Sequence, residues 1–407
     1  MIQIAILGFG VVGSGTAEVL TENKAIIEKK VGQPFDIKYI LDLRDFPDSP
    51  FADKVIHDFK VILHDPEVSL VAEMMGGSHP AYDFTKACLE AGKSVVTSNK
   101  EVVANFGTEL LAIAKAHGVS YQFEASVGGG IPIIRPMNQD LSSNNITAVN
   151  GILNGTTNYI LTKMEREGTP FSEVLKDAQK KGYAEANPTA DIEGLDAARK
   201  IVILAAMAFG KRMDPNTIPC EGITKITVED MELARELGYA IKLIGHTEIK
   251  DGKILCMVSP RLVPFSTPLA GVSDVFNGIL LDADMVGQVM VYGPGAGKLP
   301  TASAVVADMI DIMEHTPAAI NAPVWTDATS EDVMDFSAYT CKRLVVVNAP
   351  LSAADGLAST FGATQFSAKD GRLAMISAAY SEAEMSALLN KIAESYPIVT
   401  CIRVLGA

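Results

Sequence analysis

Short apolar runs alternate with amphipathic stretches along the first 130 residues of the chain. Buried strands are predicted at 2–7, 35–42, 68–75, 93–99 and 119–126, with helical patterns at 15–30, 80–91 and 101–117. Strands that alternate with helices indicate a parallel, doubly wound sheet. The pattern therefore predicts an α/β fold with an N-terminal Rossmann-type domain over residues 1–132.

The pattern changes after about residue 146. A strand is predicted at 146–154, helices at 155–166, 172–181 and 191–209, and β-rich segments at 254–263 and 284–293. This mixture predicts an α+β domain over residues 133–297. A strongly amphipathic helix is predicted at 301–315.

The last 70 residues have their own β-α-β rhythm. Residues 338–407 read as strand, helix, two strands, helix and strand, the order of a ferredoxin-like module. The proline-containing stretch 315–325 reads as a linker that leads to this module.

Composition and charge narrow the classes of function. The formal net charge of −15 and the scattered lysines argue against nucleic-acid and membrane-surface binding. Apolar runs are too short to span a membrane, and the N-terminus lacks the features of a signal peptide. The five cysteines are far apart, with no zinc-binding spacing. We expect a cytoplasmic protein with reduced thiols.

A glycine-rich turn follows the first strand. Gly8, Gly10 and Gly13 stand where a Rossmann domain binds the pyrophosphate of a dinucleotide, although such triads also form ordinary tight turns. After the second strand, Asp42 favours NAD through the ribose hydroxyl, whereas Arg44 favours NADP through the 2′-phosphate. The sequence therefore predicts NAD or NADP as cofactor.

Polar residues gather at two further strand ends. Ser98, Asn99 and Lys100 follow a predicted parallel strand, at the edge where open α/β sheets bind ligands. Glu124 precedes three glycines and a proline, and this segment suits a hinge between domains, with a cation site as the alternative.

The second domain carries a separate group of polar residues. Thr156 or Thr157 is expected to cap a helix whose N-terminus could bind an anionic group. In "DIEGLDAARK", Asp191 is a candidate N-cap, and Asp196 and Lys200 are i,i+4 partners. An apolar run follows Lys200 directly, so the residues favour a proton-transferring lysine and a plain ion pair about equally.

Six motifs together resemble the homoserine dehydrogenase family. They are "GFGVVG", "SNKEVVA", "FEASVGGGIPII", "NGILNGTTNYIL", "GYAEANPTADIEGLDAARK" and "YGPGAGKLPTASAVVAD", in the order and spacing of the family. No aspartokinase domain precedes residue 2, so the chain resembles the monofunctional type with a C-terminal ACT-like domain.

The resemblance implies reversible NAD(P)-dependent reduction of L-aspartate 4-semialdehyde to L-homoserine, in threonine, methionine and isoleucine biosynthesis. It makes Lys200 the proton donor and acceptor, and Lys100 a second active-site lysine. The implied substrate residues are Glu185, Asp191, Asp196, Thr156, Thr157 and Gly182. The implied cofactor residues are Gly8, Phe9, Gly10, Val12, Gly13, Arg44, Ser98, Lys100 and Gly297.

The resemblance also reverses the preference for a plain hinge, because Glu124, Val127, Gly129 and Ile131 match a loop that binds a monovalent, sodium-like cation. It implies a substrate-binding and dimerisation domain at 133–297, hence a homodimer or higher homo-oligomer. It also implies that the helix at about 298–316 packs back on the first domain and completes it. The ACT-like module implies an amino-acid effector, but "NAPLSAADGLA" lacks the Pro-Gly turn that is usual at that site.

Two other interpretations compete with this one. A different Rossmann-type semialdehyde or imine reductase would share the glycine-rich turn but should lack Asp196, Lys200 and "NGTTNYI". A non-catalytic nucleotide and amino-acid sensor would bind the cofactor without turnover.

Overall fold

The computed structural model describes residues 1–315, 322–369 and 371–406. The chain divides into two compact units, and each is described by itself. Unit 1 comprises 1–145, 202–215 and 293–327, and unit 2 comprises 146–201, 216–292 and 328–407. Residues 316–321 of the predicted linker lie outside the described residues. The predicted boundaries of three domains stay a prediction.

Unit 1 contains the predicted parallel sheet. Its strands, in spatial order, are β3 (Val55–Ile56), β2 (Phe35–Leu41), β1 (Ile2–Leu7), β4 (Val68–Glu73), β5 (Ser94–Thr97) and β6 (Tyr121–Gln122). Every neighbouring pair is parallel. The order reverses between β1 and β4, which makes this the switch point where doubly wound sheets bind ligands. The Rossmann-type prediction is confirmed.

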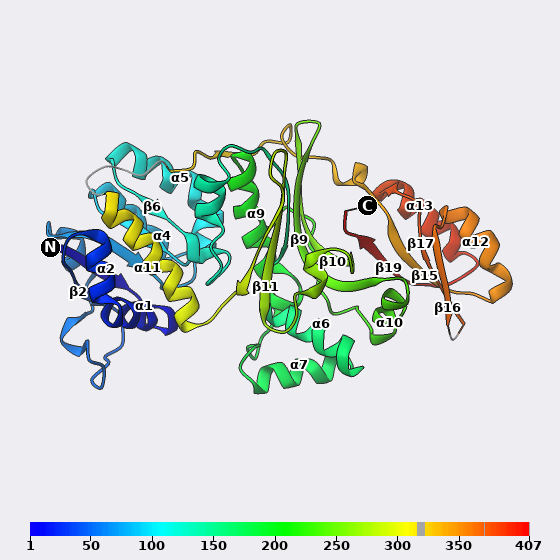
Figure 1. Cartoon of the computed structure of the whole chain (residues 1–407), viewed down its shortest axis with the longest axis horizontal. Helices are drawn as coiled ribbons and strands as arrows, with labels where there is room; N and C mark the ends of the chain where they lie inside the picture. Colours follow the sequence, from blue (N-terminus) through cyan, green and yellow to red (C-terminus); the bar gives the residue numbers. More distant parts are fainter. Residues whose placement is uncertain (316–321, 370, 407) are drawn as a thin grey trace. The chain divides into compact units, whose positions relative to one another are not determined.

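Helices cover this sheet. They are α1 (Val11–Glu22), α2 (Lys24–Val31), α3 (Phe59–His64), α4 (Ala81–Glu90), α5 (Lys100–His117) and α11 (Lys298–His315). The yellow helix α11 lies beside α1 (Figure 1), and its Val305 and Met309 share one core with Ile4 and Ile6. A sequence-distant helix thus completes the core of unit 1.

Two predicted elements of unit 1 have different bounds. The helix predicted at 15–30 is two helices, because Asn23 leaves helical geometry between α1 and α2 (φ −96°, ψ 11°). The strand predicted at 119–126 shrinks to β6, because Glu124–Ser126 forms a 3-10 turn.

Unit 2 contains a larger sheet. Its strands, in spatial order, are β12 (Gly287–Pro294), β11 (Phe276–Ala283), β7 (Ile146–Ile152), β9 (Tyr239–Lys250), β10 (Lys253–Pro264), β19 (Ile398–Val404), β15 (Arg343–Asn348), β17 (Arg372–Ile376) and β16 (Gln365–Lys369). The helices are α6 (Gly155–Glu167), α7 (Phe171–Lys180), α8 (Thr189–Ile192), α9 (Leu195–Phe209), α10 (Val228–Glu236), α12 (Ala354–Phe361) and α13 (Glu382–Ala393). Helix α9 begins in unit 2, and its residues from Val202 onward belong to unit 1.

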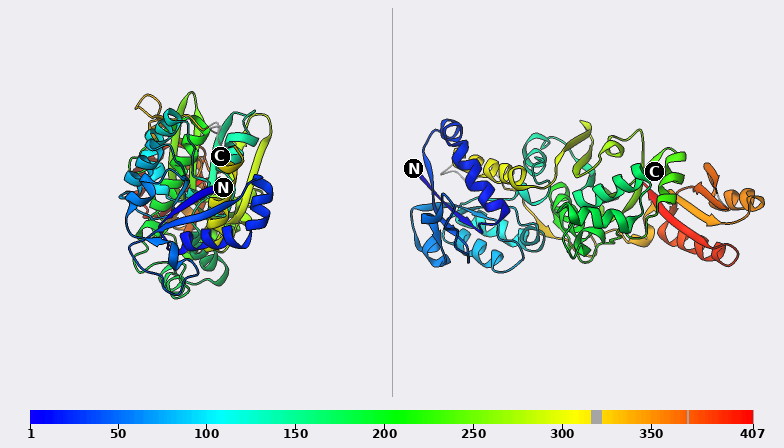
Figure 2. Two further views of the ribbon diagram at one scale, coloured as in Figure 1. Left: turned by 90° about the vertical axis from the view of Figure 1, so that its left-hand side faces the viewer. Right: turned by 90° about the horizontal axis from the view of Figure 1, so that it is seen from below.

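The strands and helices from β15 to β19 form a C-terminal module. They run β15-α12-β16-β17-α13-β19, and the antiparallel order β19-β15-β17-β16 is ferredoxin-like, as predicted. Both helices cover one face, where Val345, Phe361 and Met375 share a core with Met385 (orange to red in Figure 2). On its other edge, β19 pairs in parallel with β10, so the module continues the sheet of unit 2.

The helix predicted at 191–209 is interrupted. Gly194 has a φ of +82° between α8 and α9, a conformation that breaks helical geometry. Asp191 therefore lies within α8, and the expectation that it caps the longer helix is wrong. None of the described helices is long and apolar enough to cross a membrane, and the five cysteines are free thiols.

Candidate active site

Lys200 and Asp196 form a buried ion pair on the first turns of α9. Their side chains are 11% and 9% exposed, and Lys200 Nζ lies 2.7 Å from Asp196 Oδ2. The same ammonium donates a hydrogen bond to the carbonyl oxygen of Leu153 at 2.7 Å. The predicted i,i+4 pair is thus present. Burial raises the cost of an uncompensated charge, so this lysine depends on its two partners.

Asn154 connects this ion pair to Asp191. Its Nδ2 lies 2.7 Å from Asp191 Oδ1 and 2.9 Å from Asp196 Oδ2. Its Oδ1 accepts the N–H of Thr157 at 2.8 Å, so Asn154 is the N-cap of α6. The expectation that Thr156 or Thr157 caps this helix is wrong, because Asn154 is the extended residue before it (φ −131°).

The remaining predicted substrate residues lie around the start of α6. The Thr157 hydroxyl donates to Asn154 O at 3.1 Å, and the Thr156 hydroxyl donates to Tyr183 O at 2.5 Å. Gly182 and Glu185 are exposed in the segment before α8. Their contact with a substrate stays a prediction.

In unit 1, the glycine-rich turn lines one side of a pocket at the switch point of the sheet. A side chain at Gly13 would place its Cβ 1.9 Å from Gly8 O, and one at Gly8 would lie 2.9 Å from Met74 O. The helix α1 that follows has no side-chain cap at Gly10, which leaves its first N–H groups for a ligand. The pocket of about 480 Å³ is lined by Gly8, Gly10, Leu41, Asp42, Leu43, Arg44, His57, Phe59, Met74, Met75, Gly76, Pro80 and Phe84.

Asp42 holds this turn in place. Its Oδ2 accepts the Phe9 N–H at 2.8 Å, and Arg44 binds both carboxylate oxygens at 3.0 Å. The hydrogen bond from Arg44 lowers the pKa of Asp42 to about 2, although partial burial opposes the shift. The Arg44 side chain is 64% exposed and packs over the ring of Phe46, so it reaches solvent at the rim of the pocket. Phe9 is buried behind the turn, and Val12 is half-buried on α1.

A buried carboxylate arranges the ends of β4 and β5. Glu73 accepts the Thr97 hydroxyl at 2.6 Å and the Met75 N–H at 2.7 Å. Asn99 caps α5, and its Nδ2 donates to Gly77 O at 2.8 Å. Lys100 is the first residue of α5, and Ser98 is half-buried just before it. The structure thus places Ser98 and Lys100 at the carboxyl edge of the sheet, as the sequence predicts.

Glu124 binds the start of the segment that follows the glycines. Its carboxylate accepts the N–H groups of Ile133, Ile134 and Arg135 at 2.5–2.8 Å. Asp308 on α11 accepts the Glu124 N–H at 2.8 Å and also binds the Arg135 guanidinium. Burial, and then the Glu124 carboxylate, raise the pKa of Asp308 to about 8, although Arg135 lowers it.

The other predicted loop residues lie between these groups. Val127 and Ile131 are buried, and Gly129 has a φ of +58° where its backbone approaches Gly295. Gly297, with a φ of +122°, directly precedes α11. Among the described residues, no group of three or more His, Cys, Asp or Glu side chains could hold a metal ion.

The predicted residues thus fall into two groups. Lys200, Asp196 and Asp191 come together around Asn154 in unit 2, and the cofactor residues gather around the switch point of unit 1. Sequence reasoning missed Asn154 and Glu73. The position of Asn154 directly before a helical pattern is a cap signal, and Glu73 is a carboxylate at the end of an apolar strand.

Comparisons with known proteins show which proteins this chain is similar to. The family model "Homoserine dehydrogenase" matches residues 132–310, and "Homoserine dehydrogenase, NAD binding domain" matches residues 8–124. A homoserine dehydrogenase of Bacillus subtilis is 43% identical over 77% of this chain and 73% of its own length.

Solved structures of homoserine dehydrogenases are also similar to this chain. A homoserine dehydrogenase from Thiobacillus denitrificans superposes with a TM-score of 0.90 at 33% identity, covering 99% of this chain and 98% of its own. A hyperthermophilic archaeal homoserine dehydrogenase in complex with NADPH has a TM-score of 0.66 at 27% identity, covering 78% of this chain and 99% of its own.

The raised pKa of Asp308 predicts a pH-dependent stability. An unfolded aspartate titrates near pH 4. A carboxyl whose pKa rises on folding contributes stability below that pH, and the contribution is lost as pH rises through about 8. We therefore expect Asp308→Asn to flatten the fall in the urea midpoint between pH 5 and pH 9.

Asp311→Asn is the matched control, because Asp311 lies on the same helix and near the same guanidinium. This variant should keep the pH dependence of the wild type. Parallel curves for wild type and Asp308→Asn would contradict the assignment of the raised pKa to Asp308.

Proposed function

The chain belongs to the homoserine dehydrogenase family, and we propose that Lys200 moves the proton in its NAD(P)-dependent oxidoreductase reaction. The proposed substrates are L-aspartate 4-semialdehyde and L-homoserine. One observation carries the proposal: Lys200 is a buried ammonium that Asp196 and Leu153 hold at 2.7 Å each. The two rival interpretations, another reductase and a non-catalytic sensor, are not favoured, because both family models belong to homoserine dehydrogenase.

The bound nicotinamide supplies or accepts the hydride, and the chain's own residues handle the proton and the charges. In the reductive direction, Lys200 donates a proton to the substrate oxygen, where negative charge develops. In the oxidative direction, it takes the proton back from the hydroxyl. Asp196 holds the ammonium and contacts the hydroxyl end of the substrate. Because Asp196 is a buried carboxylate, it also compensates the lysine charge in the absence of substrate.

One end of the substrate carries both an ammonium and a carboxylate, so its binding needs negative groups for the first and positive or N–H groups for the second. We propose that Asp191 and Glu185 bind its ammonium through charge-assisted hydrogen bonds. We propose that Thr156, Thr157 and Gly182 lie near its carboxylate, which would face the N-terminus of α6. The support is the Asn154 amide, which holds Asp191 and Asp196 within hydrogen-bonding distance of one side chain.

The dinucleotide is proposed to bind at the pocket of unit 1. Gly8, Phe9, Gly10, Val12 and Gly13 would hold the pyrophosphate, because the turn admits no Cβ at Gly8 or Gly13 and the helix start lacks a side-chain cap. Ser98, Lys100 and Gly297 are proposed to lie toward the nicotinamide, with Lys100 as the second active-site lysine.

We propose that the protein prefers NADP(H) to NAD(H). Both oxygens of Asp42 already accept hydrogen bonds from Phe9 and Arg44, so the carboxylate is not set up to receive a ribose hydroxyl. Arg44 reaches solvent at the pocket rim, together with His57, where a 2′-phosphate could accept charge-assisted hydrogen bonds.

A monovalent cation is proposed to bind the loop of Glu124, Val127, Gly129 and Ile131. Hard cations prefer oxygen ligands. Within the described chain, no backbone N–H donates to the carbonyl oxygens of Val127, Gly129 or Ile131. Glu124 adds a buried negative charge, although its carboxylate already accepts three N–H groups. The residues fit a site built chiefly from backbone oxygens.

For the whole protein we propose a cytoplasmic homodimer or higher homo-oligomer that serves threonine, methionine and isoleucine biosynthesis. The C-terminal module is proposed to be ACT-like and to bind an amino-acid effector, with subunit association as its other role. The ferredoxin-like strand order supports the module's class.

Replacing Lys200 tests the proposed reaction. We expect Lys200→Ala to lower kcat for NAD(P)H oxidation with L-aspartate 4-semialdehyde by about two to four orders of magnitude. Arg199→Gln is the control, because Arg199 is the neighbouring cation on α9 and is only half-buried. Turnover like that of the wild type in a folded Lys200→Ala protein would refute the proton-transfer role.

Arg44→Gln tests the cofactor preference. Loss of a charge-assisted contact typically costs about 1.5–3 kcal/mol, so the KM for NADPH should rise about tenfold or more. The KM for NADH should stay near its wild-type value, which makes NADH the internal control. Equal changes for both cofactors would mean that Arg44 acts only by holding Asp42 and the glycine-rich turn.

Adding L-threonine tests the C-terminal module. If the module binds an amino-acid effector, millimolar L-threonine should lower turnover, whereas D-threonine should not. Unchanged turnover would remove L-threonine as the effector and favour subunit association.

A further inference from the structure

A short segment, residues 219–223, connects β10 to the turn between α8 and α9. On one side, Pro219 O accepts the Val258 N–H at 2.9 Å, and the Glu221 N–H donates to Val258 O at 2.8 Å. On the other side, the Ile223 N–H donates to Ile192 O at 2.8 Å. The segment is therefore hydrogen-bonded both to a central strand and to the helix break.

The segment and the turn pack without space between them. A Cβ at Gly222 would lie 2.2 Å from Ile192 O and 2.6 Å from the Cα of Glu193. The Cys220 thiol donates to Glu193 O at 3.2 Å. A Cβ at Gly194 would lie 3.1 Å from Cys220 Sγ. Residues 192–194 therefore cannot shift unless the segment shifts with them.

The turn at 192–194 lies between the two carboxylates of the proposed substrate site. Asp191 precedes it on α8, and Asp196 follows it on α9. The Asn154 amide binds both carboxylates at 2.7 Å and 2.9 Å. Because the turn joins their backbones, its position sets the spacing of the two carboxylates.

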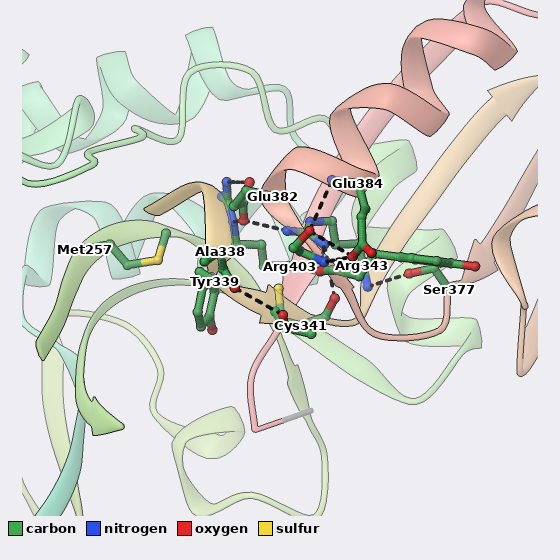
Figure 3. A network of polar contacts seen from close by, with 12 residues as sticks. Met257, Ala338, Tyr339, Cys341, Arg343, Ser377, Glu382, Glu384 and Arg403 are labelled. Atoms are coloured by element: carbon green, nitrogen blue, oxygen red, sulfur yellow. Dashed lines mark hydrogen bonds and ion pairs between the residues drawn. The ribbon is translucent and has the colours of Figure 1, made fainter. Parts of the chain in front are cut away.

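The C-terminal module binds the segment 219–223 through an ion pair. Nη1 of Arg403, on β19, lies 2.8 Å from Glu221 Oε1. The same guanidinium binds both oxygens of Glu382 at 2.7 Å and 3.0 Å, and Arg343 also binds Glu382 (Figure 3). The Arg403 side chain is 10% exposed, whereas that of Glu221 is 50% exposed. Arg403 is thus the fixed partner, and Glu221 is the one that it holds.

We propose that Glu221 is a positioning residue for the substrate site: its ion pair with Arg403 fixes the segment 219–223, and through it the turn between Asp191 and Asp196. The residue contacts no reacting atom in this role. The C-terminal module would then contribute directly to substrate affinity. The inference rests on the proposed substrate role of Asp191 and Asp196.

Glu221 can be changed without emptying a core. It borders a cavity of about 250 Å³ that Arg343, Glu382 and Arg403 also line, and its side chain is half exposed. Arg403 keeps both oxygens of Glu382 as partners when the Glu221 charge is removed, so its buried charge stays compensated. Gln has nearly the same shape as Glu and cannot pair with a guanidinium as an anion, so Glu221→Gln removes the ion pair with little other change.

The test measures steady-state kinetics of the full chain in the oxidative direction. We expect Glu221→Gln to raise the KM for L-homoserine about threefold to tenfold, as for changes along a coupling route. Its kcat should stay within about twofold, and its KM for NADP⁺ should not change. A merely structural role would instead lower the melting temperature and affect both substrates.

Lys369→Gln is the matched control. Lys369 of the module binds Glu232 on α10, so this variant also removes an ion pair between the module and the rest of unit 2. It does not touch the segment 219–223, and its kinetics should match the wild type. An equal rise in KM for Lys369→Gln would overturn the proposal, as would an unchanged KM for Glu221→Gln.

The variant Asp191→Asn distinguishes a failure of the positioning role of Glu221 from a failure of the proposed substrate site. If Asp191→Asn raises the KM for L-homoserine and Glu221→Gln does not, the substrate site stands and the positioning role fails. If Asp191→Asn leaves the KM unchanged, the substrate role of this carboxylate fails, and the inference falls with it.

Discussion

Lys200 carries its charge among buried side chains, and a charge withdrawn from water must be compensated inside the protein. Asp196 supplies the opposite charge, and the Leu153 carbonyl supplies an acceptor. The Asn154 amide donates a hydrogen bond to the same Asp196 carboxylate and another to Asp191. These contacts connect the residue after β7, the start of α6 and both sides of the break between α8 and α9 around one ammonium.

Carboxylates perform a similar task in unit 1, where they bind backbone N–H groups rather than a lysine. Asp42 accepts from Phe9 in the glycine-rich turn, and Glu73 accepts from Met75 beyond β4. Glu124 accepts from the backbone N–H groups of 133–135. Each carboxylate fixes an irregular segment at or after the carboxyl end of a parallel strand. Carboxylates therefore anchor these irregular segments by hydrogen bonds within the chain itself.

Periodicity was enough to predict the parallel sheet, the ferredoxin-like module and the Lys200–Asp196 pair, because each depends on local spacing in the sequence. Local signals failed where a single residue leaves the repeating geometry, as Asn23 does between α1 and α2 and Gly194 does before α9. Neither the link from Arg403 to Glu221 nor the pairing of β19 with β10 could be predicted, because the partners meet only after folding.

The parallel pairing of β19 with β10 has an evolutionary consequence. Without β19, the edge of β10 at Arg261 and Leu262 would expose unpaired N–H and C=O groups, which other chains can use to add a strand. Deletion of the module in a descendant gene would therefore have to be accompanied by new protection of that edge, such as a charged side chain, a proline or a covering loop. Covering this edge would favour retention of the module even if it bound no ligand.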